Sequence, residues 1–183
     1  MGKSSTRRRN SITCQSKDAS CYNSIKTAFH SSQKNKKGLD CKTISKLIDC
    51  FPNFLGCFAQ NSIDKSFFRY PVTFLVNVDS FSQKGSHWLA IGLFEKSLEV
   101  FDPLGFQIFK WNQIPCKLLR FLHRYGRKRK VLISKRIQPT HSFNCAFYSL
   151  YYILKRNKHS FESIQKRFPR RSSNERVLKN FFM

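Results

Sequence analysis

The chain has 183 residues, of which 40% are hydrophobic and 15% aromatic, which excludes an intrinsically disordered chain and indicates a globular domain with a hydrophobic core. No apolar run approaches the length of a membrane span, so no transmembrane segment is expected. The formal net charge of +24 predicts a polyanionic partner, with nucleic acid ranked before an anionic membrane surface.

Three basic segments carry this charge. Residues 1–38 hold nine Lys and Arg against one acid, residues 110–136 hold ten and no acid, and residues 155–179 hold nine against two. The stretch between, residues 39–109, holds six bases and seven acids. A single run of this kind is usually a solvated face, but three together indicate a surface for double-stranded DNA. The residues that we expect to bind DNA are Arg7, Arg8, Arg9, Arg127, Lys128, Arg129, Lys130, Arg170 and Arg171.

The cysteine pattern argues against a secreted disulfide scaffold and against a metal centre. The chain has seven cysteines, an odd number, and no secretory signal precedes them. We therefore expect no disulfide framework and an intracellular, reducing compartment. No C-x2-C spacing occurs, so no metal ligands are predicted.

The first 38 residues are rich in Ser, Asn, Lys and Arg, and we expect a flexible basic arm with one short helix near residues 20–30. From residue 39 on, apolar spacing and β-branched runs predict regular elements. They are a helix at 41–51, strands at 70–80, 87–94 and 98–102, a helix in the second half of 106–127, a strand at 130–137, and helices at 145–157, 160–168 and 173–182. This order predicts that residues 39–183 form an α+β domain with a mostly antiparallel central sheet flanked by helices.

The stretch "GSHWLAIGLFEKSLEVFDPLG" predicts a hairpin with a histidine at one end and an acid at the other. A turn near residues 95–97 places His87 and Asp102 on adjacent strands at the same open end. A carboxylate beside an imidazole fixes its tautomer and stabilises its protonated form, which suits a general base. The alternative is a purely structural His–Asp hydrogen bond that caps the hairpin.

Cys145 favours the catalytic interpretation of that pair. It opens an apolar helix, where the helix field and a nearby histidine would favour a reactive thiolate, whereas a cysteine inside such a helix is usually only core. Gln138 lies seven residues before it, at a strand end, and its amide could share an oxyanion with the Cys145 backbone N–H. His141, in the loop between them, is expected near the substrate groove or in solvent, and Asn144 is expected near the site.

These motifs together resemble those of a known family. The H-W pair at His87, the D-P-L-G run fifteen residues after that histidine, and the Q-x6-C spacing that ends at Cys145 are similar to the adenovirus proteinase (adenain) family. The likeness is greatest to the versions carried by Polinton/Maverick elements and adintovirus-like viruses. It covers roughly residues 41–160, and the segments "FLGCF" and "VTFLVNVD" upstream of the histidine resemble the family as well.

The resemblance implies a papain-like cysteine endopeptidase whose site residues occur in the permuted order His, Asp, Gln, Cys. Carried over, His87 is the base and later the acid, Asp102 orients it, Cys145 is the nucleophile, Gln138 contributes to the oxyanion hole, and Trp88 packs beside the site. The resemblance further implies DNA as an activating polyanion and no obligatory metal. An activating peptide is a further implied partner, although the stretch "RYGRKRKVLISKR" lacks the cysteine that such a peptide would bond.

The leading hypothesis is thus a monomeric, DNA-stimulated endopeptidase that matures viral or transposon capsid and core precursors in the host nucleus or in the virion. A second hypothesis is a protease that deconjugates SUMO- or ubiquitin-like proteins, which Asp102 favours because those proteases carry Asp where the adenovirus enzymes carry Glu. A third is a basic DNA-binding or packaging protein without activity. A degenerate protease kept for DNA binding is also considered, because Ala146 replaces the glycine that usually follows the nucleophile.

Overall fold

The structure is a computed structural model that describes residues 11–49, 51–63, 70–78, 87–105, 114, 116–169 and 171–183. Side chains are not described for residues 11–20 and for residue 171. The DNA-binding predictions for Arg7, Arg8, Arg9 and Arg170, and that for the side chain of Arg171, therefore lie outside the described residues.

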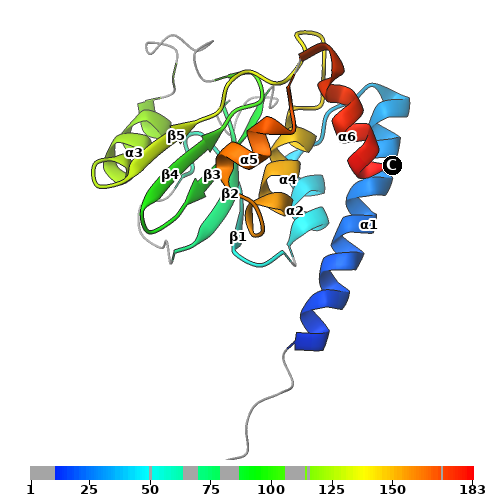
Figure 1. Cartoon of the computed structure of the whole chain (residues 1–183), viewed down its shortest axis with the longest axis horizontal. Coiled ribbons are helices and arrows are strands. Elements are labelled where there is room, and N and C mark those ends of the chain that lie inside the picture. Colours follow the sequence, from blue (N-terminus) through cyan, green and yellow to red (C-terminus); the bar gives the residue numbers. More distant parts are fainter. Residues whose placement is uncertain are drawn as a thin grey trace, which may run out of the picture.

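The described strands form a mixed five-stranded sheet in which they lie in chain order (Figure 1). They are β1 (Phe54–Ala59), β2 (Val72–Asn77), β3 (Trp88–Leu93), β4 (Ser97–Phe101) and β5 (Lys130–Ile133). The pairs β2–β3 and β3–β4 are antiparallel, whereas β1 and β5 run parallel to their neighbours. The predicted α+β class is confirmed, but the mostly antiparallel sheet is only partly right. The sequence pattern of a strand does not reveal its direction, and the crossover through α3 (Cys116–Gly126) makes β5 parallel to β4.

Strand β1 is absent from the sequence prediction because Pro52 and Gly56 are typical of a break. Gly56 has a φ of +127°, a conformation that side chains rarely adopt, and the register of β1 on β2 shifts between Phe54 and Cys57. The glycine therefore lets the strand bulge and continue where the pattern predicts an end.

The two faces of the sheet are covered by different helices. Along β3, Trp88 and Ala90 belong to the apolar cluster that includes α4 (Cys145–Arg156), whereas Leu89 and Ile91 belong to the cluster that includes α3. Figure 1 shows α3 on one side of the sheet and α4 on the other. The remaining helices, α2 (Cys41–Ile48), α5 (Phe161–Lys166) and α6 (Asn174–Phe182), contribute to the cluster on the α4 side. Every position of β3 is buried and all but Gly92 are hydrophobic, as burial on both faces requires.

The N-terminal segment differs from its prediction as a flexible arm. It contains a 25-residue helix, α1 (Ser11–Asn35), which is much longer than the short helix expected near residues 20–30. Ile25 and Phe29 are fully buried, and the Phe29 ring packs 4.9 Å from the ring of Phe147 and 5.4 Å from that of Phe182. The second half of α1 is therefore part of the core, while its first turns project beyond the rest of the fold (Figure 1).

A buried ion pair fixes α4 on the sheet. Arg156 donates two hydrogen bonds of 2.7 Å to the carboxylate of Glu99 in β4, and the Tyr152 hydroxyl donates a third of the same length. A side chain at Gly92 would collide with the Tyr152 hydroxyl, so the glycine leaves room for this contact. Because the pair is satisfied on all sides, it holds the register of α4 and hence the position of the residue that opens it.

Cys21 is disulfide-bonded, which differs from the expectation of a chain without disulfides. An odd number of cysteines does not exclude a single bond. The cysteines described as free thiols are Cys41, Cys57, Cys116 and Cys145. Among the helices of the described ranges, none combines the length and the apolarity that crossing a bilayer requires.

Candidate active site

His87 lies immediately before β3, at the open end of the hairpin. Its backbone carbonyl accepts a hydrogen bond of 3.1 Å from Val78, which ties it to the end of β2. Its Nε2 atom lies 2.7 Å from Oδ1 of Asp102, which directly follows β4. The histidine is 5% exposed and the aspartate is fully buried. The antiparallel hairpin thus brings the two residues together at the open end of β3 and β4.

The turn "DPLG" holds the Asp102 carboxylate in place. Oδ1 accepts a second hydrogen bond, of 2.9 Å, from the Leu104 N–H, and Gly105 donates its N–H to the Asp102 carbonyl at 3.0 Å. Gly105 has a φ of +81°, and a Cβ there would come within 2.9 Å of Arg136. The glycine is therefore required both for the turn and for the close approach of the following loop.

Ser134, which directly follows β5, fixes the backbone of Asp102. Its hydroxyl accepts a hydrogen bond from the Asp102 N–H and donates one to the Asp102 carbonyl, both at 2.8 Å. Sequence reasoning missed this residue, because it lies 32 positions away, directly after the parallel strand β5, and no local motif marks it. It is a positioning residue for the acid.

Cys145 is the first residue of α4 and is 7% exposed. A hydrogen bond joins it to the imidazole of His87. Asp102 and Cys145 are thus both hydrogen-bonding neighbours of one imidazole. The imidazole therefore contacts both a carboxylate and a thiol, the arrangement of an orienting acid, a base and a nucleophile.

The histidine is held in its charged form. Burial alone lowers the pKa of His87, but its hydrogen bonds to Asp102 and Cys145 and the negative charges of both groups raise the pKa from 6.5 to about 9. The imidazole is thus protonated at neutral pH. A neighbouring cation of this kind favours the thiolate form of a cysteine.

The N-terminus of α4 has no side-chain cap. Asn144 occupies the N-cap position, but its side chain makes no capping hydrogen bond to the helix. The first N–H groups of α4 therefore lack the usual side-chain acceptor, and the helix dipole adds positive potential at Cys145. Backbone donors in this position can stabilise an oxyanion that forms next to the sulfur.

Gln138 lies beside the acid. Its N–H donates a hydrogen bond of 2.8 Å to the carbonyl of Pro103, the neighbour of Asp102, and its side-chain Nε2 donates one of 2.7 Å to the carbonyl of Ser142. Its buried Oε1 has no partner among the described residues. The second N–H of the amide is the donor that the oxyanion prediction requires.

Three further predicted residues have different outcomes. Trp88 packs in the same apolar cluster as Cys145, and its indole N–H donates to the carbonyl of Leu39 at 2.9 Å. His141 is exposed in the loop before α4. The side-chain oxygen of Asn144, which is predicted to lie near the site, accepts a hydrogen bond of 2.9 Å from Gln33 of α1.

The side-chain nitrogen of Asn144 donates to Glu175 of α6 at 2.5 Å. Both ends of the Asn144 side chain are therefore occupied, and the residue links α1, the nucleophile loop and α6. Asn144 thus has a structural role directly before Cys145, and its contact with substrate stays a prediction. Sequence reasoning placed this residue by its distance along the chain from Cys145, and that distance does not give the direction of a side chain.

The basic residues between α3 and β5 divide into two groups. Arg127, Lys128 and Lys130 are exposed. Arg129 instead donates to the carbonyls of Phe94 and Tyr125, at 2.9 and 3.1 Å, and its guanidinium lies 4.5 Å from the ring of Tyr70. These contacts give Arg129 a structural role, and its contact with DNA stays a prediction.

A basic face of α3 was missed by the sequence reasoning. Lys117, Arg120 and Arg124 follow one another at helical spacing and line a cavity of about 480 Å³ together with the aromatic rings of Phe121 and Tyr125. The signal was present in the sequence, since bases three and four residues apart share one side of a helix. These residues extend the exposed basic surface that begins at the turn after α3.

No protein-family model matches the chain, and no curated protein matches it either. Among solved structures, the chain is similar to the ASFV pS273R protease, with a TM-score of 0.47 and 18% sequence identity. The match covers 80% of this chain and 67% of that one. A likeness at this level does not establish the reaction, which is inferred from the site itself.

Proposed function

We propose that the protein is a cysteine endopeptidase with Cys145 as nucleophile, His87 as acid and base, and Asp102 as the orienting group. The observation that carries this proposal is the buried imidazole of His87, which hydrogen-bonds to Asp102 at 2.7 Å and to Cys145, the first residue of α4. A structural His–Asp cap would account for the first contact, but not for the thiol beside the same imidazole.

The reaction follows from these positions. The Cys145 thiolate attacks the carbonyl carbon of a peptide bond, and the developing oxyanion accepts hydrogen bonds from the Cys145 N–H and the Gln138 amide. Protonated His87 gives its proton to the leaving amine, so the carbon–nitrogen bond breaks and an acyl-enzyme remains. Neutral His87 then takes a proton from water, which attacks the thioester and releases the acid and the thiolate.

The substrate class is proposed from the charge of the molecule and from the motifs of the adenain-like family. The exposed bases of α3 and of the turn after it form a surface suited to the phosphates of duplex DNA. We propose that DNA stimulates cleavage of viral or transposon capsid and core precursors, in the host nucleus or in the virion, by confining enzyme and substrate to one polyanion. No step requires a metal, and an activating peptide remains an additional proposed partner.

A cleavage assay tests the proposal. The full chain and Cys145→Ala are incubated with a peptide library, with and without duplex DNA, at low and at moderate salt, and products are identified by mass spectrometry. We expect cleavage by the wild type only, stimulated by DNA and less so as salt rises. The matched variant Cys116→Ala, which removes an exposed thiol, keeps full activity.

The same assay separates the alternatives. If the wild type cleaves only substrates that end in diglycine and ignores DNA, the deconjugating protease is the better account. If neither library nor diglycine substrate is cleaved while DNA binds tightly, the protein is a DNA-binding protein without this activity.

A further inference from the structure

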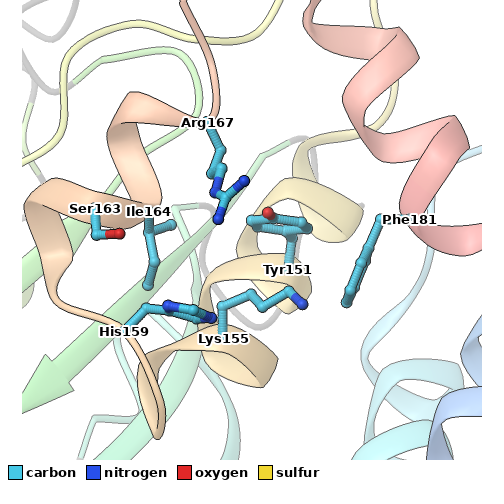
Figure 2. A pocket seen from close by; sticks show the side chains of 7 residues that line it. All are labelled: Tyr151, Lys155, His159, Ser163, Ile164, Arg167 and Phe181. Carbon is cyan, nitrogen blue, oxygen red and sulfur yellow. The ribbon is translucent and has the colours of Figure 1, made fainter.

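A second cavity lies on α4 away from the candidate active site. It has a volume of about 160 Å³ and is lined by Tyr151 and Lys155 of α4, His159 in the following turn, Ser163, Ile164 and Arg167 from α5 onward, and Phe181 of α6 (Figure 2). Its α4 residues come six and ten positions after Cys145, about 9 and 15 Å along the helix axis. The cavity is thus distinct from the groups that surround the thiol.

Positive charge gathers at this cavity without a negative partner. Lys155 and Arg167 line it, and no acid is among its lining residues. In the described part of the chain neither cation forms an ion pair. Burial, followed by the positive charges of Arg167 and Lys158, lowers the pKa of Lys155. Like charges that face one cavity destabilise each other, and an anion would relieve that repulsion.

Hydrogen-bond donors line the same cavity. Figure 2 shows the Arg167 guanidinium directed toward Tyr151, whereas Ser163 lies on the far side of Ile164 and the Lys155 ammonium is directed toward Phe181. No described residue accepts a hydrogen bond from the side chains of Arg167, Ser163, His159 and Tyr151. A surface cluster of cations ordinarily spreads into solvent, whereas here Tyr151 is only 5% exposed and the groups come from three segments. Such a set of donors around one cavity is what an anion site requires.

We propose that this cavity binds a phosphate monoester or free phosphate in its dianionic form. Two cations match two negative charges, and the tetrahedral oxygens offer acceptors to the guanidinium, the imidazole and the Tyr151 hydroxyl. The phosphodiester of a DNA backbone carries one charge and is substituted on two sides, so it fits a cavity of this size less well. The apolar wall of Ile164 and Phe181 would contact the carbon atoms of an ester.

The ligand would contact the nucleophile helix, α4, and the two helices α5 and α6 that pack beside it. Lys155 lies in α4, Ser163 in α5, and the Phe181 ring, over which the Lys155 ammonium sits at 4.4 Å, in α6. Binding therefore stabilises the packing of α4 against α5 and α6, and this proposal does not depend on whether Cys145 is catalytic.

The test measures thermal unfolding of the full chain and calorimetric binding, with inorganic phosphate and with phenyl phosphate, against chloride at equal ionic strength. Arg167→Gln removes a lining cation from an exposed position, and Lys155→Met removes the ammonium that lies 4.4 Å from the Phe181 ring while keeping an unbranched side chain. The matched control is Lys166→Gln, which removes the same charge from the neighbouring exposed residue outside the cavity. We expect both phosphates to raise the melting temperature of the wild type and of the control.

The same probes should bind Arg167→Gln and Lys155→Met at least about tenfold more weakly, as expected for the loss of a charge-assisted contact. Equal binding by Arg167→Gln and Lys166→Gln would overturn the proposal, because only net charge would then matter. The proposal also fails if neither phosphate stabilises the wild type beyond chloride. A short DNA duplex that displaces phenyl phosphate and loses affinity equally in Arg167→Gln would assign the cavity to the DNA surface instead.

Discussion

The substitution Asp102→Asn should uncouple the charge of His87 from the geometry of the site. Asn keeps an oxygen that can accept from the imidazole and from Leu104, so the turn is preserved, but the negative charge 2.7 Å from Nε2 is lost. A neighbouring opposite charge shifts a pKa by about 1 to 3 units. We therefore expect the pKa of His87 to fall by about 2 units from its value of about 9, which corresponds to roughly 3 kcal/mol.

The raised pKa of His87 determines how the free energy of unfolding changes with pH. A histidine with a folded pKa of about 9 and an unfolded pKa near 6.5 contributes stability that is complete below pH 6.5 and is lost as the pH rises through 9. Wild-type protein should thus lose up to roughly 3 kcal/mol of unfolding free energy across that interval. The Asp102→Asn variant should lose much less.

Nuclear magnetic resonance titration of the histidine side chains, with denaturant unfolding at pH 6 and pH 10, measures both quantities. The control is Asp49→Asn, which removes an exposed carboxylate outside the site and should leave the His87 titration unchanged. A His87 pKa that stays near 9 in Asp102→Asn would refute the reasoning, because the carboxylate would then not be its main support.

Three other substitutions or reactions test the surrounding structure. Gly105→Ala should lower stability by about 1 to 3 kcal/mol and reduce activity, because the φ of Gly105 is +81° and a Cβ there would lie 2.9 Å from the backbone nitrogen of Arg136. Denaturant unfolding measures the loss, and an unchanged midpoint would contradict the prediction. Glu99→Gln should destabilise the protein by about 3 to 5 kcal/mol, since it leaves Arg156 without its buried partner, whereas the exposed Glu95→Gln should change stability by less than about 0.5 kcal/mol in the same assay. Burial and the neighbouring thiol of Cys41 raise the pKa of Cys57 to about 12, so Cys57 should be alkylated slowly at pH 8. Mass spectrometry measures the rate, and rapid labelling would show that the Cys57 thiol is accessible and unperturbed.

The sequence predicts the central part of the fold and site because the signals there are local. The hairpin of β3 and β4 is set by a short turn between two apolar runs, and antiparallel pairing then determines which residues meet at its open end. His87 and Asp102 follow from that geometry alone. Cys145 is placed because a polar loop gives way to an apolar helix at that residue.

Other features depend on contacts between distant segments, which no local pattern reveals. Ile25 of α1 is buried because it belongs to an apolar cluster with residues of α2, α4 and α6. The sequence of α1 is too polar to indicate this burial. The direction of β5 depends on the crossover through α3. The structural roles of Arg129 and Asn144 depend on carbonyl and carboxylate groups supplied by other elements. Charge and chain position therefore did not reveal these contacts.

Alkylation kinetics of the full-length chain test the central claim most directly. The protein is treated with iodoacetamide from pH 5 to pH 9, and the labelling rate of each cysteine is followed by mass spectrometry, with exposed Cys41 and Cys116 as internal references. Cys145 is only 7% exposed, so burial alone would make it the slower thiol. The account predicts that near pH 6 Cys145 is labelled much faster than both references, and that His87→Ala abolishes the difference. Labelling of Cys145 no faster than Cys41 and Cys116 across this range would contradict the assignment of a thiolate nucleophile.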